Sequence, residues 1–270
     1  MSRYAYGDFD IIDSHAHIFP AALADKAADS IGGFYGLKPG HPGSPEELLR
    51  EGAKYGVKMY LVCSVATAPH QVRDINSFIA KECAEHPEFF GFGTLHPDMD
   101  GLEDEVERII KLGLHGIKLH PDFQRFNLDS PESFRIYDSI QGRLPLLVHM
   151  GDHRYDSSSP ERLSRVLNNF PRLEVIAAHF GGFMRWESAR EILKRPNVKV
   201  DTSSSLFILD KDYARKLIDH YGVENCFFGT DFPLWDYGGE VERFFKLDLP
   251  FDYMDRILSR NFREYFRLNN

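Results

Sequence analysis

Cysteine is scarce in this chain, with three residues among 270. Cys63, Cys83 and Cys226 lie far apart and form no CxxC pair, so the sequence predicts neither a disulfide framework nor a thiolate zinc site. Long apolar runs are also missing, and no stretch approaches the ~20 residues that span a bilayer. The first residues contain no apolar segment of a secretion signal. We therefore expect a cytoplasmic protein that has no membrane partner.

Basic residues are fewer than acidic ones, 32 against 41, and the formal net charge is -9. Such a chain has no electrostatic basis for gripping a polyanion, so a nucleic-acid partner is not expected. Hydrophobic residues make up 43% and charged residues 27%, which is the balance of an ordinary folded domain and not of a disordered chain. Because a single core stops growing near ~250 to 300 residues, we expect one domain over residues 1–270.

Short apolar runs typical of buried parallel strands alternate with amphipathic helical stretches, about every 25 to 30 residues after the first pair. The eight predicted strands are Phe9–Ile18, Val57–Val65, Phe89–Leu95, Leu114–His120, Leu144–His149, Leu173–His179, Val198–Thr202 and Asn225–Thr230. The predicted helices are Glu46–Tyr55, Gln71–His86, Leu102–Leu112, Pro131–Gln141, Pro160–Asn169, Arg185–Leu193, Asp212–Tyr221 and a last one at Asp252–Leu268. Eight such units predict an α/β fold, a closed (β/α)8 TIM barrel whose functional end is the C-terminal end of its strands. A doubly wound open sheet is the alternative.

The segment between the first strand and the first helix, residues 19–44, is long and rich in Gly, Pro and Ala. Loops of this length in a compact domain are usually functional or disordered. After the first strand of a barrel, the segment would lie on the functional face. We therefore predict a lid over the pocket mouth, hinged and without regular structure, with a surface excursion of no function as the alternative.

Histidines gather at the predicted strand ends, where the functional face of a barrel lies. Six of the twelve do so, namely His15, His17, His96, His120, His149 and His179. His15 and His17 are two residues apart, and alternate residues of a strand share a face, so their two imidazoles can approach one ion. Burying polar groups unpaired costs on the order of 2 to 7 kcal/mol each, and coordination to a metal ion removes that cost.

Four motifs lie at these strand ends: Asp13-Ser14-His15-Ala16-His17, His149, His179-Phe180-Gly181-Gly182 and Gly229-Thr230-Asp231-Phe232-Pro233. With these motifs in this order, the chain resembles the amidohydrolase superfamily over nearly its whole length. Within the superfamily it is most similar to the amidohydrolase-2 branch, which contains metal-dependent hydrolases, decarboxylases of 2-amino-3-carboxymuconate semialdehyde and of aromatic acids, and some hydratases. The resemblance implies that one divalent ion is held by His15, His17, His149 and Asp231, and that His179 is catalytic.

These ligand types indicate the kind of ion. Three imidazoles, one carboxylate and an open position match a catalytic zinc site, so we expect one Zn²⁺, with Mn²⁺ or Fe²⁺ as alternatives. The resemblance gives Asp231 a second, catalytic role, in which it accepts the proton of the attacking water while it remains a ligand. His179 would polarise the attacked group or act as general acid or base. The alternative for all of these histidines is a hydrogen-bonded core.

Lys118 leaves the number of ions open. Two-metal branches of the superfamily bridge their ions with a carboxylated lysine at the end of the fourth strand, and Lys118 lies near the end of the fourth predicted strand. In that case His149 and His179 would hold the second ion. The alternative is that Lys118 pairs with Asp13, which shares a face with His15.

Substrate contacts are predicted for His120 and for three arginines that follow strand ends, Arg125, Arg154 and Arg185. A guanidinium can hold a carboxylate in a bidentate pair, although each arginine is otherwise a solvated surface charge. The expected enzyme is a metal-dependent hydrolase that uses metal-activated water on a small amide, ester or lactone. The first alternative is a metal-dependent non-oxidative decarboxylase or hydratase of a small unsaturated or aromatic carboxylic acid.

A second alternative is a barrel that binds or scaffolds without catalysis. That alternative predicts a missing ligand, and none is missing. The expected partner is a small-molecule substrate. Related proteins are often dimers, so a homodimer is an open alternative to a monomer.

Overall fold

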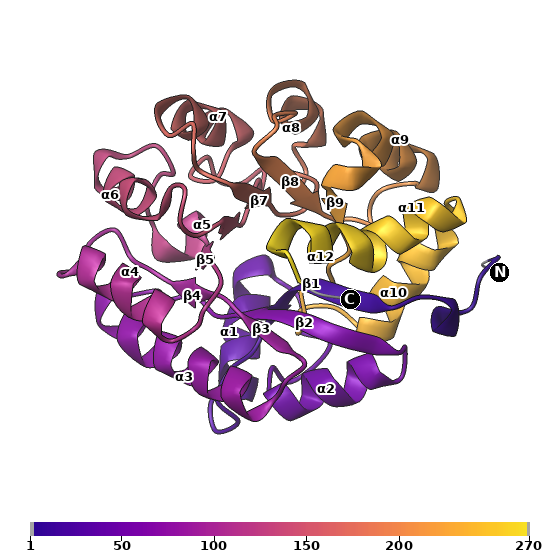
Figure 1. The fold of residues 1–270 in the computed structure, drawn as a ribbon, viewed down its shortest axis with the longest axis horizontal. Coiled ribbons are helices and arrows are strands. Elements are labelled where there is room, and N and C mark those ends of the chain that lie inside the picture. Colours follow the sequence, from indigo (N-terminus) through magenta and orange to yellow (C-terminus); the bar gives the residue numbers. More distant parts are fainter. Residues whose placement is uncertain (1–2, 269–270) are drawn as a thin grey trace. The chain divides into compact units, whose positions relative to one another are not determined.

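A computed structural model describes residues 3–268, which fall into two compact units. The first unit is drawn from residues 1–62 and 201–270, and the second unit contains residues 63–200. Figure 1 labels their helices and strands. Strands alternate with helices along the chain, and the pairs recorded within each unit are parallel, so the organisation is α/β.

The first unit is built around β1, of which every residue is buried. Its strands are β1 (Ile11–His17), β2 (Val57–Cys63, whose last residue belongs to the second unit) and β9 (Cys226–Phe227). Its helices are α1 (Ala24–Tyr35), α2 (Pro45–Ala53), α9 (Lys211–Tyr221), α10 (Tyr237–Lys246), α11 (Phe251–Asp255) and α12 (Asn261–Phe266). The backbone N–H groups of Ser14 and His17 donate to the carbonyls of Phe228 and Phe232, at 2.8 and 2.7 Å. The segment that follows β9 therefore runs alongside β1.

The second unit contains a continuous parallel ladder from β4 to β8. Its strands are β3 (Phe89–Gly91), β4 (Gly93–Thr94), β5 (Ile117–Leu119), β6 (Leu146–Val148), β7 (Val175–Ala177) and β8 (Val198–Asp201, whose last residue belongs to the first unit). Its helices are α3 (Val72–Glu85), α4 (Leu102–Lys111), α5 (Pro121–Gln124), α6 (Pro131–Ile140), α7 (Pro160–Asn169) and α8 (Trp186–Ile192). In Figure 1, α4, α6 and α7 lie along the outer side of this ladder. All residues of β5, β6 and β7 are buried, as expected of parallel strands covered by helices.

All eight predicted strands are confirmed, although each is shorter than predicted. Each of the eight predicted ranges contains an observed strand. The range Phe89–Leu95 contains two, because the ladder is interrupted at Phe92. The hydrogen bonds continue across this interruption, since His115 N–H donates to Gly91 O and Gly93 N–H to Gly116 O, both at 2.9 Å. The break is therefore a local irregularity within one segment.

The predicted helices are confirmed for α2, α3, α4, α6, α7, α8 and α9, with ends that differ by one or two residues at most. The start of α2 shows why, because the Ser44 hydroxyl accepts from Glu47 N–H at 3.2 Å and proline occupies the first turn. The last predicted helix, Asp252–Leu268, is confirmed as a helical segment without a gap, although its middle is not α-helical. It consists of α11, a π-helical segment at Arg256–Arg260 and α12. The short α5 and the longer α10 are not in the prediction.

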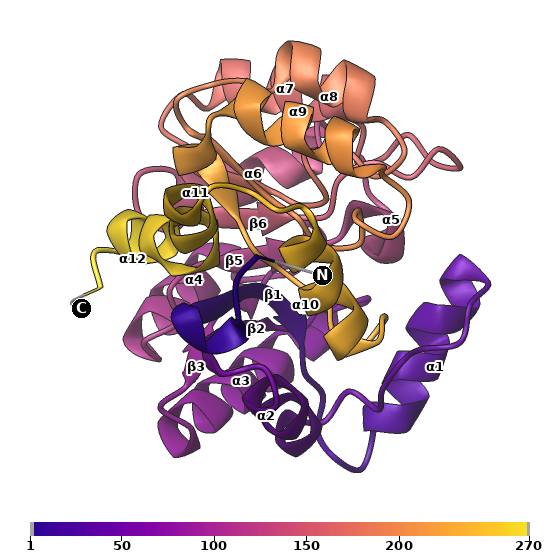
Figure 2. The same ribbon diagram turned by 90° about the vertical axis from the view of Figure 1, so that its right-hand side faces the viewer.

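The segment 19–44 contains a regular helix, α1, so the prediction of a segment without regular structure is wrong. The helix runs through the Gly32-Gly33 pair and is followed by Gly36, whose φ of 69° is the left-handed conformation typical of the residue after a helix. A Cβ on Gly32 would lie 2.6 Å from Leu37 O and from Pro39, so glycine is required where the chain folds back. Figure 2 shows α1 standing apart from α2 and β1 of the same unit.

None of the helices in residues 3–268 is both long enough and apolar enough to span a bilayer.

Candidate functional site

Three ligand-type side chains of the first unit converge. His15 Nε2 lies 3.3 Å from His17 Nε2 and 3.4 Å from Asp231 Oδ1, and the third side of the triangle is 3.5 Å. Three atoms at these spacings share a point about 2 Å from each, which is the usual distance of zinc from nitrogen or oxygen ligands. The two histidines are buried, and Asp231 is nearly so. The structure thus brings three of the four predicted ligands together.

Asp231 reaches this cluster from a strained backbone. Its φ is 59°, and a left-handed residue other than glycine costs on the order of 1 to 3 kcal/mol. Its N–H donates to His15 O at 2.8 Å, which ties the residue to β1. A Cβ on Gly229 would lie 3.0 Å from the Cβ of His15, so the glycine allows the two segments to lie this close. The hydrogen bond and the close packing hold the carboxylate beside the imidazoles, against the cost of the left-handed backbone.

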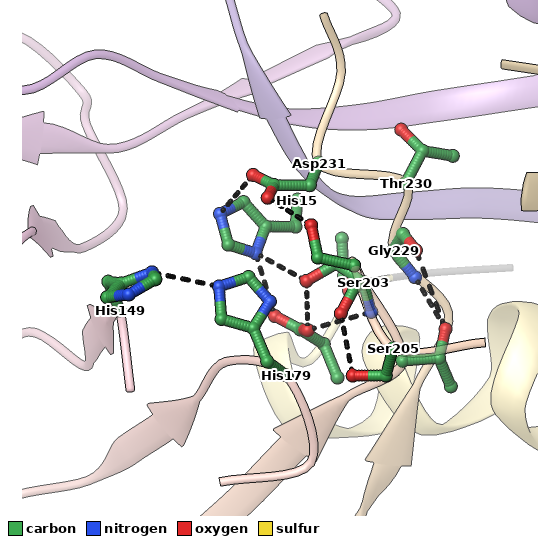
Figure 3. Close-up of polar contacts among 12 residues, drawn as sticks. His15, His149, His179, Ser203, Ser205, Gly229, Thr230 and Asp231 are labelled. Carbon is green, nitrogen blue, oxygen red and sulfur yellow. Dashed lines mark hydrogen bonds and ion pairs between the residues drawn. The ribbon is translucent and has the colours of Figure 1, made fainter. Parts of the chain in front are cut away.

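The side of His15 that faces away from the cluster is also occupied by polar groups. His15 Nδ1 lies 2.9 Å from Asp201 Oδ2 and 3.1 Å from Ser203 Oγ, and both residues are buried. The Ser203 hydroxyl donates to Asp201 Oδ1 at 2.5 Å, and its backbone N–H donates to the same oxygen at 3.1 Å. Figure 3 shows the contacts of His15 with Ser203 and Asp231 on opposite sides of the ring.

A second chain of hydrogen bonds holds Asp231. The Ser204 hydroxyl donates to Asp231 Oδ2 at 2.5 Å, and the indole N–H of Trp235 donates to Ser204 Oγ at 2.6 Å. The ring of Phe207 packs on Trp235 with centroids 4.1 Å apart. One carboxylate oxygen of Asp231 is therefore held, while the other is directed at the two histidines.

Asp13 links the two segments that carry the ligands, β1 with His15 and the segment after β9 with Asp231. Its Oδ1 accepts from the backbone N–H groups of His15 and Thr230, at 3.1 and 3.0 Å. Its Oδ2 accepts from the Thr230 hydroxyl at 2.6 Å and the Tyr237 hydroxyl at 3.1 Å. Burial raises the pKa of Asp13 to about 7, although these hydrogen bonds oppose the rise. The four bonds fix the backbone immediately before Asp231 against that of β1.

The predicted fourth ligand His149 and the predicted catalytic His179 lie together in the second unit. His179 Nε2 is 2.9 Å from His149 Nδ1, a contact drawn in Figure 3. The indole N–H of Trp186 donates to His179 O at 3.0 Å, which holds the backbone at the start of the turn. His179 and Phe180 both have left-handed φ values, 61° and 50°, so this turn is strained as well.

His120, predicted to contact substrate, stacks on His149 with ring centroids 3.8 Å apart and planes within 7°. Ring-nitrogen lone pairs lie in the ring plane, so two parallel rings do not aim at one ion as His15 and His17 do. Asp122 lies at the same place, with Oδ2 accepting from Ser158 Oγ at 2.7 Å and 3.7 Å from His149 Nε2. Burial raises the pKa of Asp122 to about 6.

The three predicted substrate arginines differ in their surroundings. Arg125 is exposed, with a left-handed φ of 59°. Arg154 is engaged by Asp152, with Nε 3.0 and 3.1 Å from its two oxygens and Nη2 2.6 Å from Oδ2. Arg185 is half-buried and donates from Nη2 to Tyr155 O at 3.1 Å. The guanidinium of Arg154 thus already binds a carboxylate of the chain itself.

Lys118 is fully buried in β5, beside Thr94 of β4 and Leu147 of β6. Its backbone carbonyl accepts from the Thr94 hydroxyl at 3.0 Å. The residues before and after Lys118 in this strand, Ile117 and Leu119, are apolar. Its predicted roles, as a bridge between two ions or as a partner of Asp13, remain predictions.

Sequence reasoning missed Asp201, Ser203 and Ser204. They belong to Asp201-Thr202-Ser203-Ser204-Ser205, which follows the apolar part of β8. Five consecutive polar residues resemble an ordinary loop, yet all five are buried. A polar run that directly continues a barrel strand toward the functional end was the available signal.

The stem of the segment 19–44 is anchored to the loop that carries Asp231. Gly40 N–H and His41 N–H donate to the carbonyls of Leu234 and Pro233, at 3.0 and 3.2 Å. The His41 ring contacts Glu47 through Nδ1 at 3.1 Å and accepts from Tyr237 N–H through Nε2 at 3.1 Å. The segment therefore returns to the end of the first unit at which its ligand cluster lies.

We predict that Gly40→Ala will loosen this anchorage. An added Cβ would lie 2.5 Å from the backbone carbon of Trp235, closer than real atoms approach, so the loop after Asp231 must shift. The melting temperature and the affinity for zinc should both fall, as measured by calorimetry and by chelator competition. Gly33→Ala is the control, because a Cβ there meets nothing within 4 Å and alanine favours the helix. Equal behaviour of the two variants would contradict the anchorage.

A known protein family matches the part of the chain that contains the ligand cluster. The family model described as amidohydrolase matches residues 12–270, which include both histidines of β1 and the segment after β9. The match covers more than nine-tenths of the chain.

Solved structures show the same fold at low sequence identity. One is an uncharacterised TIM-barrel protein from Bordetella bronchiseptica, with 18% identity, TM-score 0.76 and coverage of 96% of this chain and 99% of that one. Another is a dihydroxybenzoic acid decarboxylase from Polaromonas with bound manganese and 2-nitroresorcinol. Its sequence identity is 15%, its TM-score is 0.75, and the match covers 97% of this chain and 98% of that one. A third is a probable 2-pyrone-4,6-dicarboxylic acid hydrolase from Acinetobacter baumannii. Its sequence identity is 14%, its TM-score is 0.72, and the match covers 96% of this chain and 100% of that one. The TIM-barrel fold predicted from the sequence is thereby confirmed.

Proposed function

Because the chain belongs to the amidohydrolase family, we propose that it is a metal-dependent enzyme that hydrolyses a small amide, ester or lactone. The observation that carries this proposal is the triangle of ligand atoms from His15, His17 and Asp231, with sides of 3.3 to 3.5 Å. Two imidazoles and one carboxylate fit a divalent ion and leave positions for a further ligand and for water. A site that keeps a position for water is catalytic in type.

The proposed ligands are these three residues and His149, which the family resemblance adds as the fourth. Nitrogen and carboxylate donors suit zinc, and manganese and iron remain the alternatives. Manganese gains some support from the decarboxylase structure that holds it. When bound, such an ion lowers the pKa of its water toward ~7 and polarises a carbonyl group.

The residues of the chain would handle the protons. Asp231 accepts the proton that the attacking water loses at Oδ2, because Oδ1 lies at the corner of the ligand triangle and Oδ2 has a second lone pair besides the one that Ser204 contacts. The water oxygen bonds to the acyl carbon, the carbon–nitrogen or carbon–oxygen bond breaks, and His179 supplies the proton that the leaving group takes. The hydrogen bond of Trp186 to His179 O holds that residue in its strained turn.

The second candidate function is decarboxylation of a small aromatic acid. It is favoured by the likeness to the dihydroxybenzoic acid decarboxylase. This reaction requires an anchor for the substrate carboxylate, and the arginines give it little support. Arg154 is engaged by Asp152 and Arg125 is exposed, which leaves the half-buried Arg185 as the best candidate. We therefore rank hydrolysis first.

The purified protein, after reconstitution with zinc, is predicted to hold one divalent ion per chain by elemental analysis. His17→Ala should lower this to well under half an equivalent, because it removes one corner of the triangle. His220→Ala, which alters a half-buried histidine of α9, should leave the count unchanged. Less than half an equivalent in the unaltered protein would contradict the site, and two equivalents would favour the two-ion alternative with Lys118.

The two reactions can be separated with one panel of substrates. The metal-loaded protein is incubated with small lactones and aryl esters, and hydrolysis is measured as proton release. It is also incubated with hydroxybenzoic acids, and decarboxylation is measured as release of carbon dioxide. Hydrolysis predicts activity in the first set that zinc chelation abolishes. Activity confined to the second set would replace the first proposal by the second, and Arg185→Lys should then raise KM.

A further inference from the structure

His15 uses its two ring nitrogens in opposite directions. Nε2 lies at the corner of the ligand triangle, 3.3 Å from His17 Nε2. Nδ1 faces Asp201 Oδ2 at 2.9 Å and Ser203 Oγ at 3.1 Å. The exposed fractions of the His15 and Asp201 side chains are 1% and 0%, so bulk water does not compete for these contacts.

The hydrogen bonds around Ser203 determine which nitrogen carries the proton. The single hydroxyl proton of Ser203 is donated to Asp201 Oδ1 at 2.5 Å, so Ser203 Oγ faces His15 as an acceptor. Asp201 Oδ2 is an acceptor as well when the carboxylate is ionised. Two acceptors directed at Nδ1 require an N–H there, and a neutral imidazole then has its lone pair on Nε2.

We infer that Asp201, supported by Ser203, is a positioning residue that fixes the orientation and tautomer of His15 for metal binding. The carboxylate also increases the electron density of the ring, which makes Nε2 a better ligand. Asp201 does not contact the substrate in this role. The inference rests on the proposed metal site but not on the reaction that the site catalyses.

The support is rigid because it is built from consecutive residues. Ser203 N–H donates to Asp201 Oδ1 at 3.1 Å, so the loop closes on the carboxylate two residues earlier. The next residue, Ser204, has a left-handed φ of 51° and donates to Asp231. One strained turn after β8 therefore holds both His15 and Asp231, two of the three corners of the triangle.

The test substitutes Asp201→Asn and Ser203→Ala in the full-length protein and measures the zinc dissociation constant by competition with a chelator. Asp201→Asn should weaken zinc binding by about 10- to 100-fold, the usual effect of removing such a partner, and Ser203→Ala by less. The melting temperature of the metal-free protein is measured for each variant, so that a loss of stability is separated from a loss of zinc affinity. Glu105→Gln is the control, since Glu105 is fully buried and its partners are Asn76, Arg73 and Arg108.

A second readout needs no metal. Nitrogen-15 NMR of the metal-free protein should show His15 with the proton on Nδ1, and Asp201→Asn should populate both tautomers, because an amide can donate or accept. Unchanged tautomer and unchanged zinc affinity in Asp201→Asn would overturn the inference. So would a loss of metal-free stability that accounts for the whole loss of affinity. If the unaltered protein binds no zinc, the proposed function fails, while the tautomer still decides the role of Asp201.

Discussion

Asp231→Asn is expected to lower turnover by roughly 10³-fold or more and to weaken zinc binding by more than about 100-fold. The amide keeps the shape of the side chain and can still accept the hydrogen bond from Ser204. It loses the negative charge that faces two imidazole nitrogens at 3.4 and 3.5 Å, and it cannot accept the proton of the attacking water. Turnover is measured with saturating zinc, so that loss of the ion and loss of the base are separated.

Asp236→Asn is the matched control for this variant. Asp236 lies in the same loop, is exposed, and caps α10 by accepting from Gly239 N–H at 2.7 Å. Asparagine is an equally good N-cap, so stability, zinc affinity and turnover should not change. Full turnover in Asp231→Asn with saturating zinc would contradict the role of Asp231 as the base. Unchanged zinc affinity would contradict its role as a ligand.

The strands and most helices could be predicted because each repeats a simple pattern. Apolar runs mark the strands of both units, and Ser44 with Pro45 marks the start of α2. The helix α1 could not be predicted in this way, because the Gly32-Gly33 pair is typical of a hinge. The glycine at position 32 is instead required by the tight return of the chain past Leu37. A steric reason of this kind depends on contacts that the sequence does not display.

The candidate site divides in the same way. Side chains that belong to a strong motif, such as His15 and Asp231, were found from residue type and spacing. Their supports were not, because Asp201 and Ser203 reach His15 across 186 and 188 positions of the chain. The engagement of Arg154 is the opposite case. Its partner Asp152 is only two residues away, so the sequence held a signal that this arginine is occupied.

The substitution His179→Asn is expected to lower turnover by about 10²- to 10⁴-fold, the usual contribution of a general acid or base, with zinc affinity within roughly twofold of the unaltered protein. Its proposed role is toward the substrate, so the ion count by elemental analysis should remain one per chain. His179 Nε2 contacts His149 Nδ1 at 2.9 Å, so a small change in affinity through His149 is compatible with this role.

Two comparisons make the result specific to the imidazole of His179. Trp186→Phe removes the indole N–H that donates to His179 O, keeps the ring nitrogens, and should reduce turnover far less. His115→Asn, at an exposed histidine of the second unit that stacks on Phe90, should have no effect. Loss of zinc from His179→Asn as complete as from Asp231→Asn would make His179 a ligand. In that case the two-ion alternative with Lys118 gains support, because there His149 and His179 hold the second ion and the general acid must be sought elsewhere.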